Sequence, residues 1–372
     1  MLINQKRKKV LVISNSFTSL YNFRRELIYK LHEQYELILY CPLDDEAKDR
    51  LNIFKEKKIR VEEMKMERRG KNPLKELALI KELKRFIKHV NPDLVFTLTI
   101  KPNIYGGLIC SSLKIPYMVN ITGLGTAFLK ENLLKKITVT LYRKAMKKCN
   151  AMFFENTENM RVMKENKIVQ GPAFLTSGSG INLEVFPKKD YPQEGNEVIL
   201  FMGRLMKEKG IEEFLDASEK LKNKYPDIRV VVVGFYEEGY EKRVQDLSGR
   251  GVIEYHQYTE NPGAFMEMCS VLVQPSYHEG MSNVCLEAAA TCRPVLASDI
   301  PGCRETVNKD VSGYVFESQN ADKLYETMER FHLLSYQEKV KMGEAGREWM
   351  IEHFDREKVV AIHYNEIKKV LG

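Results

Sequence analysis

The sequence predicts an α/β protein made of two doubly wound domains, each with a parallel β-sheet covered by helices on both faces. Short apolar runs alternate with amphipathic segments along the whole chain, which is the rhythm of repeated βαβ units. The rhythm restarts after residues 178–196, a segment rich in glycine, proline and polar side chains. A chain of 372 residues also exceeds what one ordinary hydrophobic core accommodates.

The first half begins with a short apolar run and continues in regular alternation. Strands are expected at 8–16, 35–43, 59–66, 92–99, 116–120 and 151–156, and helices at 23–34, 73–90 and 128–148. The helix at 73–90 carries a proline in its first turn, where the missing N–H is tolerated. In the helix at 128–148, Leu129, Leu133, Ile137 and Leu141 form one apolar stripe, which is expected to cover the sheet.

The second half repeats this pattern, with helical segments such as 210–225 between the strands. Strands are expected at 197–205, 228–236, 252–258, 270–276, 294–298 and 313–316. Ligands of such sheets bind at the carboxyl ends of the strands. We expect these ends of the two domains to face each other across a cleft.

Composition excludes several classes of protein. Hydrophobic content of 44% with 29% charged residues is typical of a globular chain, and no apolar run approaches the ~18 residues that span a bilayer. The basic start is followed by only four apolar residues, "VLVI", so it predicts a first strand and a cytoplasmic protein. The seven cysteines are odd in number and scattered, which indicates reduced, buried thiols.

Charge divides unevenly between the two halves. Residues 1–180 contain 34 basic and 18 acidic side chains, a net charge of +16, whereas residues 181–372 contain 24 and 33, a net charge of −9. A basic half predicts contact with an anionic surface or ligand. Charge by itself leaves nucleic acid and anionic lipid equally open.

Several catalytic motifs are absent from the sequence. The first strand–helix turn has no glycine, which argues against a dinucleotide cofactor. There is no Walker phosphate loop, no Gly-x-Ser-x-Gly, no His-Glu-x-x-His and no Asp-x-Asp. We therefore expect neither a cofactor nor a bound metal ion.

The stretch "FMGRLMKEKG" is the first positive feature. A strand is expected to end at Gly203, and Arg204 and Lys209 follow before Gly210 opens a helix. A small backbone, a guanidinium fork and an ammonium beside a helix N-terminus suit a diphosphate. A solvated basic turn would have the same composition.

The stretch "SYHEGMSNVCLE" is the second positive feature. Gly280 permits a tight turn after a strand, so that the N–H groups of Met281, Ser282 and Asn283 can point at an anion. A helix that begins near Ser282 puts Glu287 about one turn further along, beyond the reach of the helix dipole. Glu279 stays outside that helix.

These motifs together resemble the retaining glycosyltransferases of family four, which have the GT-B fold. The resemblance rests on "GRLMKEKG", "PSYHEG" with its Glu-x7-Glu spacing, "LEAAATCRPVLASDIPGCRETV" and "SGYVF". In the first half, "YNFRREL" and "TIKPNIYGGLICSSLKIPYMVNITGLGTAF" resemble the subgroup that extends lipid-linked oligosaccharides and capsular or O-antigen repeat units. That subgroup includes N-acetylgalactosaminyl transferases acting on undecaprenyl-diphosphate bacillosamine. The resemblance implies a first domain of residues 1–184 plus about 356–372, whose last helix crosses back, and a second domain of residues 185–355.

The resemblance also implies roles for individual residues. Arg204 and Lys209 would bind the diphosphate of a UDP-sugar, Glu287 its ribose, and Glu279 the donor sugar or the charge at its anomeric carbon. The full implied donor-binding set is Gly203, Arg204, Lys209, Tyr258, Glu279, Gly280, Met281, Ser282, Asn283 and Glu287, with Glu279, Arg204 and Lys209 catalytic. The implied acceptor-binding set is Thr18, Arg24, Lys101, Asn103, Thr122 and Gly123.

Two positions depart from the family pattern. Phe17 and Thr18 stand where many relatives carry a glycine-rich loop. Thr99-Ile100-Lys101 stands where some relatives place a histidine that touches the donor sugar, so Lys101 is expected to meet the acceptor diphosphate instead.

The sequence therefore predicts a metal-independent retaining transferase that moves a hexose or N-acetylhexosamine, with N-acetylgalactosamine favoured, from a UDP-sugar to a polyprenyl-diphosphate-linked saccharide. Cations at Lys135, Lys136, Arg143, Lys144, Lys147 and Lys148, with Lys6–Lys9 and Arg68–Arg69, predict peripheral attachment to the inner face of the cell membrane. A UDP-sugar 2-epimerase of the same fold and a basic nucleic-acid-binding or scaffold protein are the alternatives. The epimerase needs acid–base groups that the dispersed histidines do not supply, and no nucleic-acid-reading motif is present.

Overall fold

The chain divides into two compact units, each built around one parallel sheet. Unit 1 comprises residues 1–179 and 357–372, and unit 2 comprises residues 180–356, close to the predicted boundaries at 184 and 356. The computed structural model describes residues 7–43, 47–66, 72–125, 128, 133–257, 259 and 261–372. The predicted cleft between the units stays a prediction.

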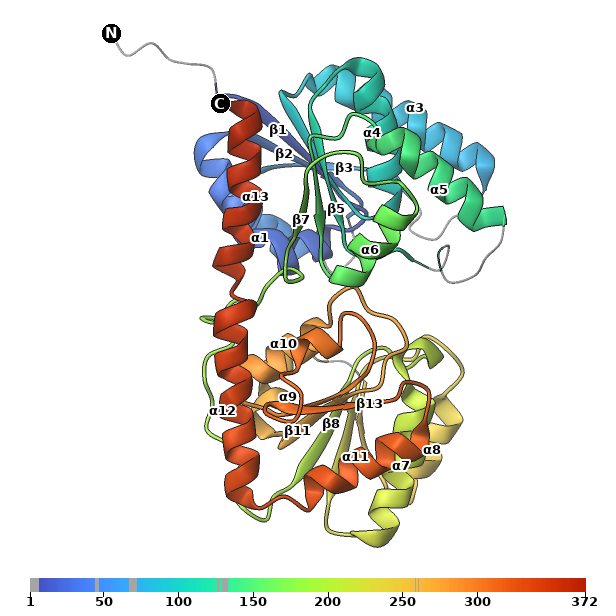
Figure 1. The fold of residues 1–372 in the computed structure, drawn as a ribbon, viewed down its shortest axis with the longest axis vertical. Helices are drawn as coiled ribbons and strands as arrows, with labels where there is room; N and C mark the ends of the chain where they lie inside the picture. The colour runs from blue at the N-terminus through green and yellow to red at the C-terminus, as the bar shows by residue number, and fades with distance from the viewer. Residues whose placement is uncertain are drawn as a thin grey trace. The chain divides into compact units, whose positions relative to one another are not determined.

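Unit 1 has a seven-stranded parallel sheet in the order β3-β2-β1-β4-β5-β6-β7 (Figure 1). Its strands are β1 (Lys9–Ile13), β2 (Glu36–Cys41), β3 (Arg60–Glu63), β4 (Leu94–Leu98), β5 (Tyr117–Ile121), β6 (Ala151–Phe154) and β7 (Ala173–Leu175). Its helices are α1 (Phe17–Gln34), α2 (Ala47–Glu56), α3 (Pro73–Val90), α4 (Ile100–Leu113), α5 (Leu133–Met146), α6 (Thr157–Glu165) and α13 (Arg356–Leu371).

Both faces of this sheet are buried at its inner strands β1, β2, β4, β5 and β6, as their runs of mostly apolar residues require. In β1, Leu11 and Ile13 pack on one face with α3, α4 and α5, whereas Val10 and Val12 pack on the other with α1 and α13. The last helix joins unit 1 because Val360, Ile367 and Leu371 pack into this second face. The sequence did not predict the edge strand β7.

Unit 2 has a six-stranded parallel sheet in the order β10-β9-β8-β11-β12-β13. Its strands are β8 (Val198–Met202), β9 (Arg229–Val233), β10 (Glu254–His256), β11 (Val271–Gln274), β12 (Val295–Ser298) and β13 (Gly313–Phe316). Its helices are α7 (Ile211–Lys224), α8 (Glu241–Gly249), α9 (Pro262–Met268), α10 (Asn283–Ala290), α11 (Ala321–His332) and α12 (Tyr336–His353), with 3-10 turns η2 (Lys207–Lys209) and η3 (Arg304–Thr306). The prediction of two doubly wound α/β domains is confirmed.

Two predicted helices differ from the structure in an instructive way. Helix α1 begins at Phe17, ahead of the expected start at 23, because the Ser16 side chain caps it by accepting from the Ser19 N–H. The expectation that Leu133 and Ile137 cover the sheet is wrong, because both are exposed. The buried face of α5 consists instead of Thr138, Val139, Tyr142, Ala145 and Met146.

Among the described residues, no helix combines the length and apolarity needed to cross a bilayer.

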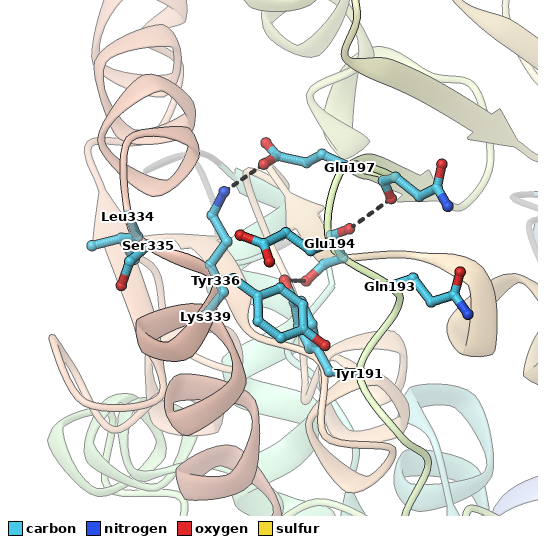
Figure 2. A pocket seen from close by; sticks show the side chains of 11 residues that line it. Tyr191, Gln193, Glu194, Glu197, Leu334, Ser335, Tyr336 and Lys339 are labelled. Atoms are coloured by element: carbon cyan, nitrogen blue, oxygen red, sulfur yellow. Dashed lines mark hydrogen bonds and ion pairs between the residues drawn. The ribbon is translucent and has the colours of Figure 1, made fainter.

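A pocket of about 220 Å³ lies at the amino ends of β8 and β11 in unit 2 (Figure 2). Its main charged groups are already paired, because Glu197 accepts from Lys339 Nζ at 2.5 Å and lies 3.0 Å from His332 Nδ1. The Tyr191 hydroxyl donates to the Ser270 carbonyl at 2.8 Å. These bonds tie the segment before β8 to α11, to α12 and to the residue before β11, so the residues that line the pocket stabilise the fold.

Lys339→Met is expected to lower the stability of unit 2, because it leaves the Glu197 carboxylate without its ammonium partner. Removing one member of a largely buried pair costs about 3 kcal/mol, equivalent to a Tm decrease of roughly 6–12 °C for a unit of this size. Thermal unfolding followed by circular dichroism measures the change. Lys220→Met is the control, because its partner Asp322 is exposed and such pairs contribute about 1 kcal/mol or less. Equal Tm values for the two variants would contradict the assignment.

Candidate active site

The carboxyl ends of β8 and β11 bring the two sequence motifs together. These strands are hydrogen-bonded neighbours and run parallel, so the segments that follow them emerge at one edge of the sheet. The segments touch at Gly210, which has a φ of +71°. A Cβ at this position would lie 2.1 Å from the Pro275 carbonyl oxygen, so only glycine permits the contact.

Lys209 and Glu279 form an ion pair across this contact. The same carboxylate oxygen, Glu279 Oε1, accepts from Ser276 Oγ at 2.9 Å and lies 3.3 Å from Gln274 Nε2. Both members of the pair are largely buried, with side chains 19% and 14% exposed. Among the described residues, no donor is bonded to Glu279 Oε2. The carboxylate is therefore held by one oxygen, and the other remains available to a ligand.

Arg204 is paired with the segment after β9 rather than with Glu279. Its guanidinium forms an ion pair with Glu237. Gly203 lies at the end of β8, where its N–H donates to the Val233 carbonyl at 2.9 Å. The role of Gly203 and Arg204 in binding a diphosphate stays a prediction, and Arg204 would have to leave Glu237 to fulfil it.

Helix α10 begins at Asn283 with Ser282 as its N-cap, as expected of a helix that starts near Ser282. The Ser282 N–H is already used, because it donates to the Gly302 carbonyl at 2.7 Å. Gly302 has a φ of +82°, and a Cβ there would lie 2.6 Å from the Gly280 carbonyl oxygen. Met281 is buried in the core of unit 2. The expectation that the Ser282 N–H points at an anion therefore does not hold in this structure, while the roles of Gly280, Met281 and Asn283 stay predictions.

Glu287 lies in the second turn of α10, as expected from its spacing. The residue is partly buried, and no hydrogen bond from the described residues reaches its carboxylate. Burial raises the pKa of this carboxyl to about 7, and the nearby Arg356 guanidinium partly opposes the rise. A desolvated carboxylate without hydrogen-bond donors is suited to accept hydrogen bonds from ligand hydroxyls.

Several residues predicted to bind the acceptor are engaged inside unit 1. Arg24 is buried and paired with Glu155, which also accepts from Asn120 Nδ2 at 3.1 Å. Asn103 is buried, accepts from Thr97 Oγ1 at 2.7 Å and donates to the Asn120 carbonyl at 2.9 Å. These contacts join α1 and α4 to the sheet.

Lys101, Thr122 and Gly123 lie at the carboxyl edge of unit 1. Lys101 Nζ donates to Glu76 Oε1 at 2.7 Å. Thr122 and Gly123 follow β5 and are half-buried, and a Cβ at Gly123 would meet no atom within 4 Å. Their roles toward an acceptor stay predictions. Tyr258, predicted beside the base, lies outside the described residues.

The sequence interpretation missed Thr99, which the structure marks as unusual. Thr99 follows β4 with a φ of +73°, a conformation that strains a β-branched residue. Its Oγ1 is buried and has no partner among the described residues, and the same holds for Thr18 Oγ1. Because β1 and β4 are neighbouring strands, both hydroxyls lie at the carboxyl edge of unit 1. Sequence spacing carries no signal for backbone strain.

All seven cysteines are buried thiols, as expected. Among the described residues, no three histidine, cysteine or acidic side chains gather in a way that could hold a metal ion.

Glu287→Gln is expected to raise Tm at pH 8 and to leave it nearly unchanged at pH 4. Because the pKa is raised on folding, the folded state holds a proton that the unfolded state releases above its ordinary pKa of about 4.3. Wild-type stability therefore falls as pH rises from about 4.5 to 7, and the amide removes this loss. Thermal unfolding of the wild type and the variant at both pH values measures the difference in Tm.

Glu254→Gln serves as the control of opposite sign. The hydrogen bond from Arg229 holds the pKa of Glu254 below its ordinary value, so this amide is expected to lower Tm slightly at pH 8. A Glu287→Gln variant that lost stability at pH 8 would contradict the assignment of a desolvated carboxylate.

Comparison with known protein families identifies one matching glycosyltransferase model for each of the two units. The family model described as "Glycosyl transferases group 1" matches residues 184–349, and the model described as "Glycosyl transferase 4-like" matches residues 9–156. A curated relative is the N,N'-diacetylbacillosaminyl-diphospho-undecaprenol alpha-1,3-N-acetylgalactosaminyltransferase of Campylobacter jejuni, 26% identical over 89% of this chain and 90% of its own. The capsular polysaccharide biosynthesis glycosyltransferase CapM of Staphylococcus aureus is 25% identical over 69% of this chain and 74% of its own.

Solved structures share the fold over nearly the whole chain. The Anabaena protein HepE, solved with UDP and glucose, matches with a TM-score of 0.78 and 15% identity over 97% of this chain and 100% of its own. A glycosyltransferase from Rickettsia africae matches with a TM-score of 0.76 and 19% identity over 98% of this chain and 99% of its own. Glycosyltransferase family models match residues of both units, and the solved structures share the fold, so the chain belongs to the family-four glycosyltransferases with the GT-B fold.

Proposed function

We propose that this glycosyltransferase is a retaining, metal-independent enzyme that transfers a hexose or N-acetylhexosamine from a UDP-sugar to a polyprenyl-diphosphate-linked saccharide. The observation that carries the proposal is the Lys209–Glu279 pair, held between the ends of two adjacent strands. The names of the relatives support the two substrates. HepE was solved with UDP, and the Campylobacter jejuni relative is named for a diphospho-undecaprenol acceptor and for N-acetylgalactosamine.

The donor side of the proposal rests on charge. Cleavage of a nucleotide-sugar bond leaves negative charge on the departing diphosphate, and a preorganised ammonium stabilises this charge most strongly in the transition state. Lys209 supplies that ammonium, and its ion pair with Glu279 holds it in place. Arg204 would exchange Glu237 for the diphosphate when the donor binds, which a guanidinium fork can do without changing its own charge.

The two glutamates take different roles in this proposal. Glu279, bonded through Oε1 only, would face the donor sugar with Oε2 and balance positive charge at the anomeric carbon. Glu287, which has no hydrogen-bond donor among the described residues, would accept from the ribose hydroxyls. Each role uses an oxygen that the described part of the protein leaves unbonded.

The acceptor would bind unit 1, at the inner face of the cell membrane where polyprenyl-linked saccharides are extended. Thr18 and Thr99 offer hydroxyls that have no partner among the described residues, and Lys101 offers a cation at the same carboxyl edge. We further propose that the product belongs to a bacterial surface polysaccharide or glycan, as the capsular relative suggests. N-acetylgalactosamine is the favoured sugar, by analogy with the Campylobacter jejuni relative.

UDP release tests the proposal directly. Purified protein is incubated with each of a panel of UDP-sugars and a polyprenyl-diphosphate saccharide, with and without EDTA. We expect UDP release with one sugar that depends on the acceptor, persists in EDTA and gives a product with the anomeric configuration of the donor by NMR. Conversion of the UDP-sugar to its 2-epimer would instead support the epimerase alternative. No turnover with any donor would overturn the proposed function.

Lys209→Ala is expected to lower kcat about 100-fold or more, because one preorganised charge at a leaving group typically contributes ~3 kcal/mol. Lys207→Ala is the matched control from the same turn. Its ammonium is exposed and lies 3.9 Å from Glu212, away from the strand ends, so its kcat is expected to stay within about twofold of wild type. Steady-state UDP release measures both, and equal effects would remove Lys209 from the mechanism.

A further inference from the structure

The turn after β9 exposes an aromatic ring at the carboxyl edge of unit 2. Phe235 follows the last residue of β9 by two positions and is 43% exposed. Every other phenylalanine in the described ranges is buried or partly buried, and so is Trp349. An exposed phenyl ring contributes little to a hydrophobic core, and at the ligand-binding edge of a parallel sheet it is available to a planar ligand.

The ring projects from the face of the sheet that α9 and α10 cover. Beyond the strand, a parallel bridge pairs Leu205 with Tyr236, and both pack on the opposite face, in the core with α7, α8 and α11. Successive residues of an extended segment point to opposite faces, so Phe235 and Glu237 project toward the face of α9 and α10. Because the Arg204 guanidinium pairs with Glu237, it lies on that face too, next to the ring.

Close backbone contacts hold this turn in place. A Cβ at Gly234 would lie 1.7 Å from the Gly203 carbonyl oxygen, so the ends of β8 and β9 lie directly against each other. The Gly234 N–H donates to the His256 carbonyl at 2.9 Å. The Phe235 carbonyl accepts from the Leu205 N–H, also at 2.9 Å. A ring on a fixed backbone loses little conformational entropy when a ligand covers it.

The order of the strands directs one end of a nucleotide sugar to this ring. In the sheet, β8 lies between β11 and β9, and Arg204, Glu279 and Phe235 follow these three strands respectively. With the diphosphate at Arg204 and the sugar at Glu279, the nucleoside extends to the other side of β8 and reaches the end of β9. Glu287, assigned above to the ribose, lies on α10 and so on the same face of the sheet as the ring.

We propose that the nucleobase of the donor stacks on Phe235. The inference rests on the proposed function and deepens it by assigning the residue that binds the base. Every nucleobase has a π-face, and its stacking on an aromatic side chain needs no hydrogen-bond partner. Because the base does not change while the sugar is transferred, the ring stabilises the ground state and the transition state equally.

Titration calorimetry of the full chain with UDP tests the proposal. Phe235→Ala is expected to raise the Kd of UDP about tenfold, because one base loses its aromatic stack. Phe235→Trp keeps a stacking surface, so its Kd is expected to stay within about threefold of the wild-type value. The control is Leu333→Ala, which removes an apolar side chain that is 67% exposed elsewhere in unit 2 and should leave the Kd unchanged.

Two further measurements separate stacking from a general disturbance of the turn. Inorganic pyrophosphate carries the charge of UDP without its base, so Phe235→Ala should compete with it as the wild type does. In steady-state UDP release, Phe235→Ala should raise the KM of the UDP-sugar about tenfold and leave kcat within about twofold of wild type, because the lost binding is uniform. Equal weakening of UDP and pyrophosphate binding would overturn the proposal.

The proposal would also be overturned by a wild type that does not bind UDP, by an unchanged Kd in Phe235→Ala, or by an equal loss in Phe235→Trp. Turnover by the wild type judges the proposed function separately. UDP release with an unchanged Kd in Phe235→Ala would overturn this inference alone. UDP binding that depends on Phe235, without turnover of any UDP-sugar, would overturn the proposed function and leave the stacking assignment in place.

Discussion

The candidate active site depends on one close backbone contact, the approach of Gly210 to the carbonyl of Pro275. Without a side chain at Gly210, the turn after β8 lies directly against the turn after β11. This contact brings Lys209 within bonding distance of Glu279, which Ser276 and Gln274 hold from the other side. An ion pair this enclosed is costly unless its members are well bonded, and three donors on one carboxylate oxygen meet that requirement.

Unit 1 distributes its polar groups differently. Its interior holds a connected set, from Arg24 through Glu155 and Asn120 to His363, that joins α1, β5 and α13. Burial, reinforced by the nearby Arg24 charge, lowers the pKa of His363 to about 3, so the ring remains neutral. The Thr18 and Thr99 hydroxyls at the carboxyl edge lack partners among the described residues. Buried polar groups whose hydrogen bonds are satisfied stabilise the fold. Polar groups with unsatisfied hydrogen bonds at the carboxyl ends of strands can instead bind a ligand.

In the proposed reaction, the carboxyl edge of the sheet in unit 2 cleaves the donor bond, and the carboxyl edge of the sheet in unit 1 binds the acceptor. Unit 2 would present a paired cation and carboxylate to the charged leaving group. Unit 1 presents two hydroxyls, of Thr18 and Thr99, that no described residue bonds, together with exposed apolar side chains on α3 and α5. Part of the basic charge of the first half lies on α5, whose own sequence contains no acidic residue.

The sequence by itself determined the two sheets, the restart of the βαβ pattern near residue 180, and the pairing of the motifs that contain Lys209 and Glu279. These features depend on apolar periodicity and local spacing, which can be read directly from the order of the residues. It placed Lys209 and Glu279 in one site, since both follow strands of one parallel sheet. Tertiary structure decided the rest. It paired Arg204 with Glu237, used the Ser282 N–H for Gly302, strained Thr99, and turned Leu133 and Ile137 outward. These outcomes depend on which neighbours reach a group across the fold, and no local pattern encodes such long-range contacts.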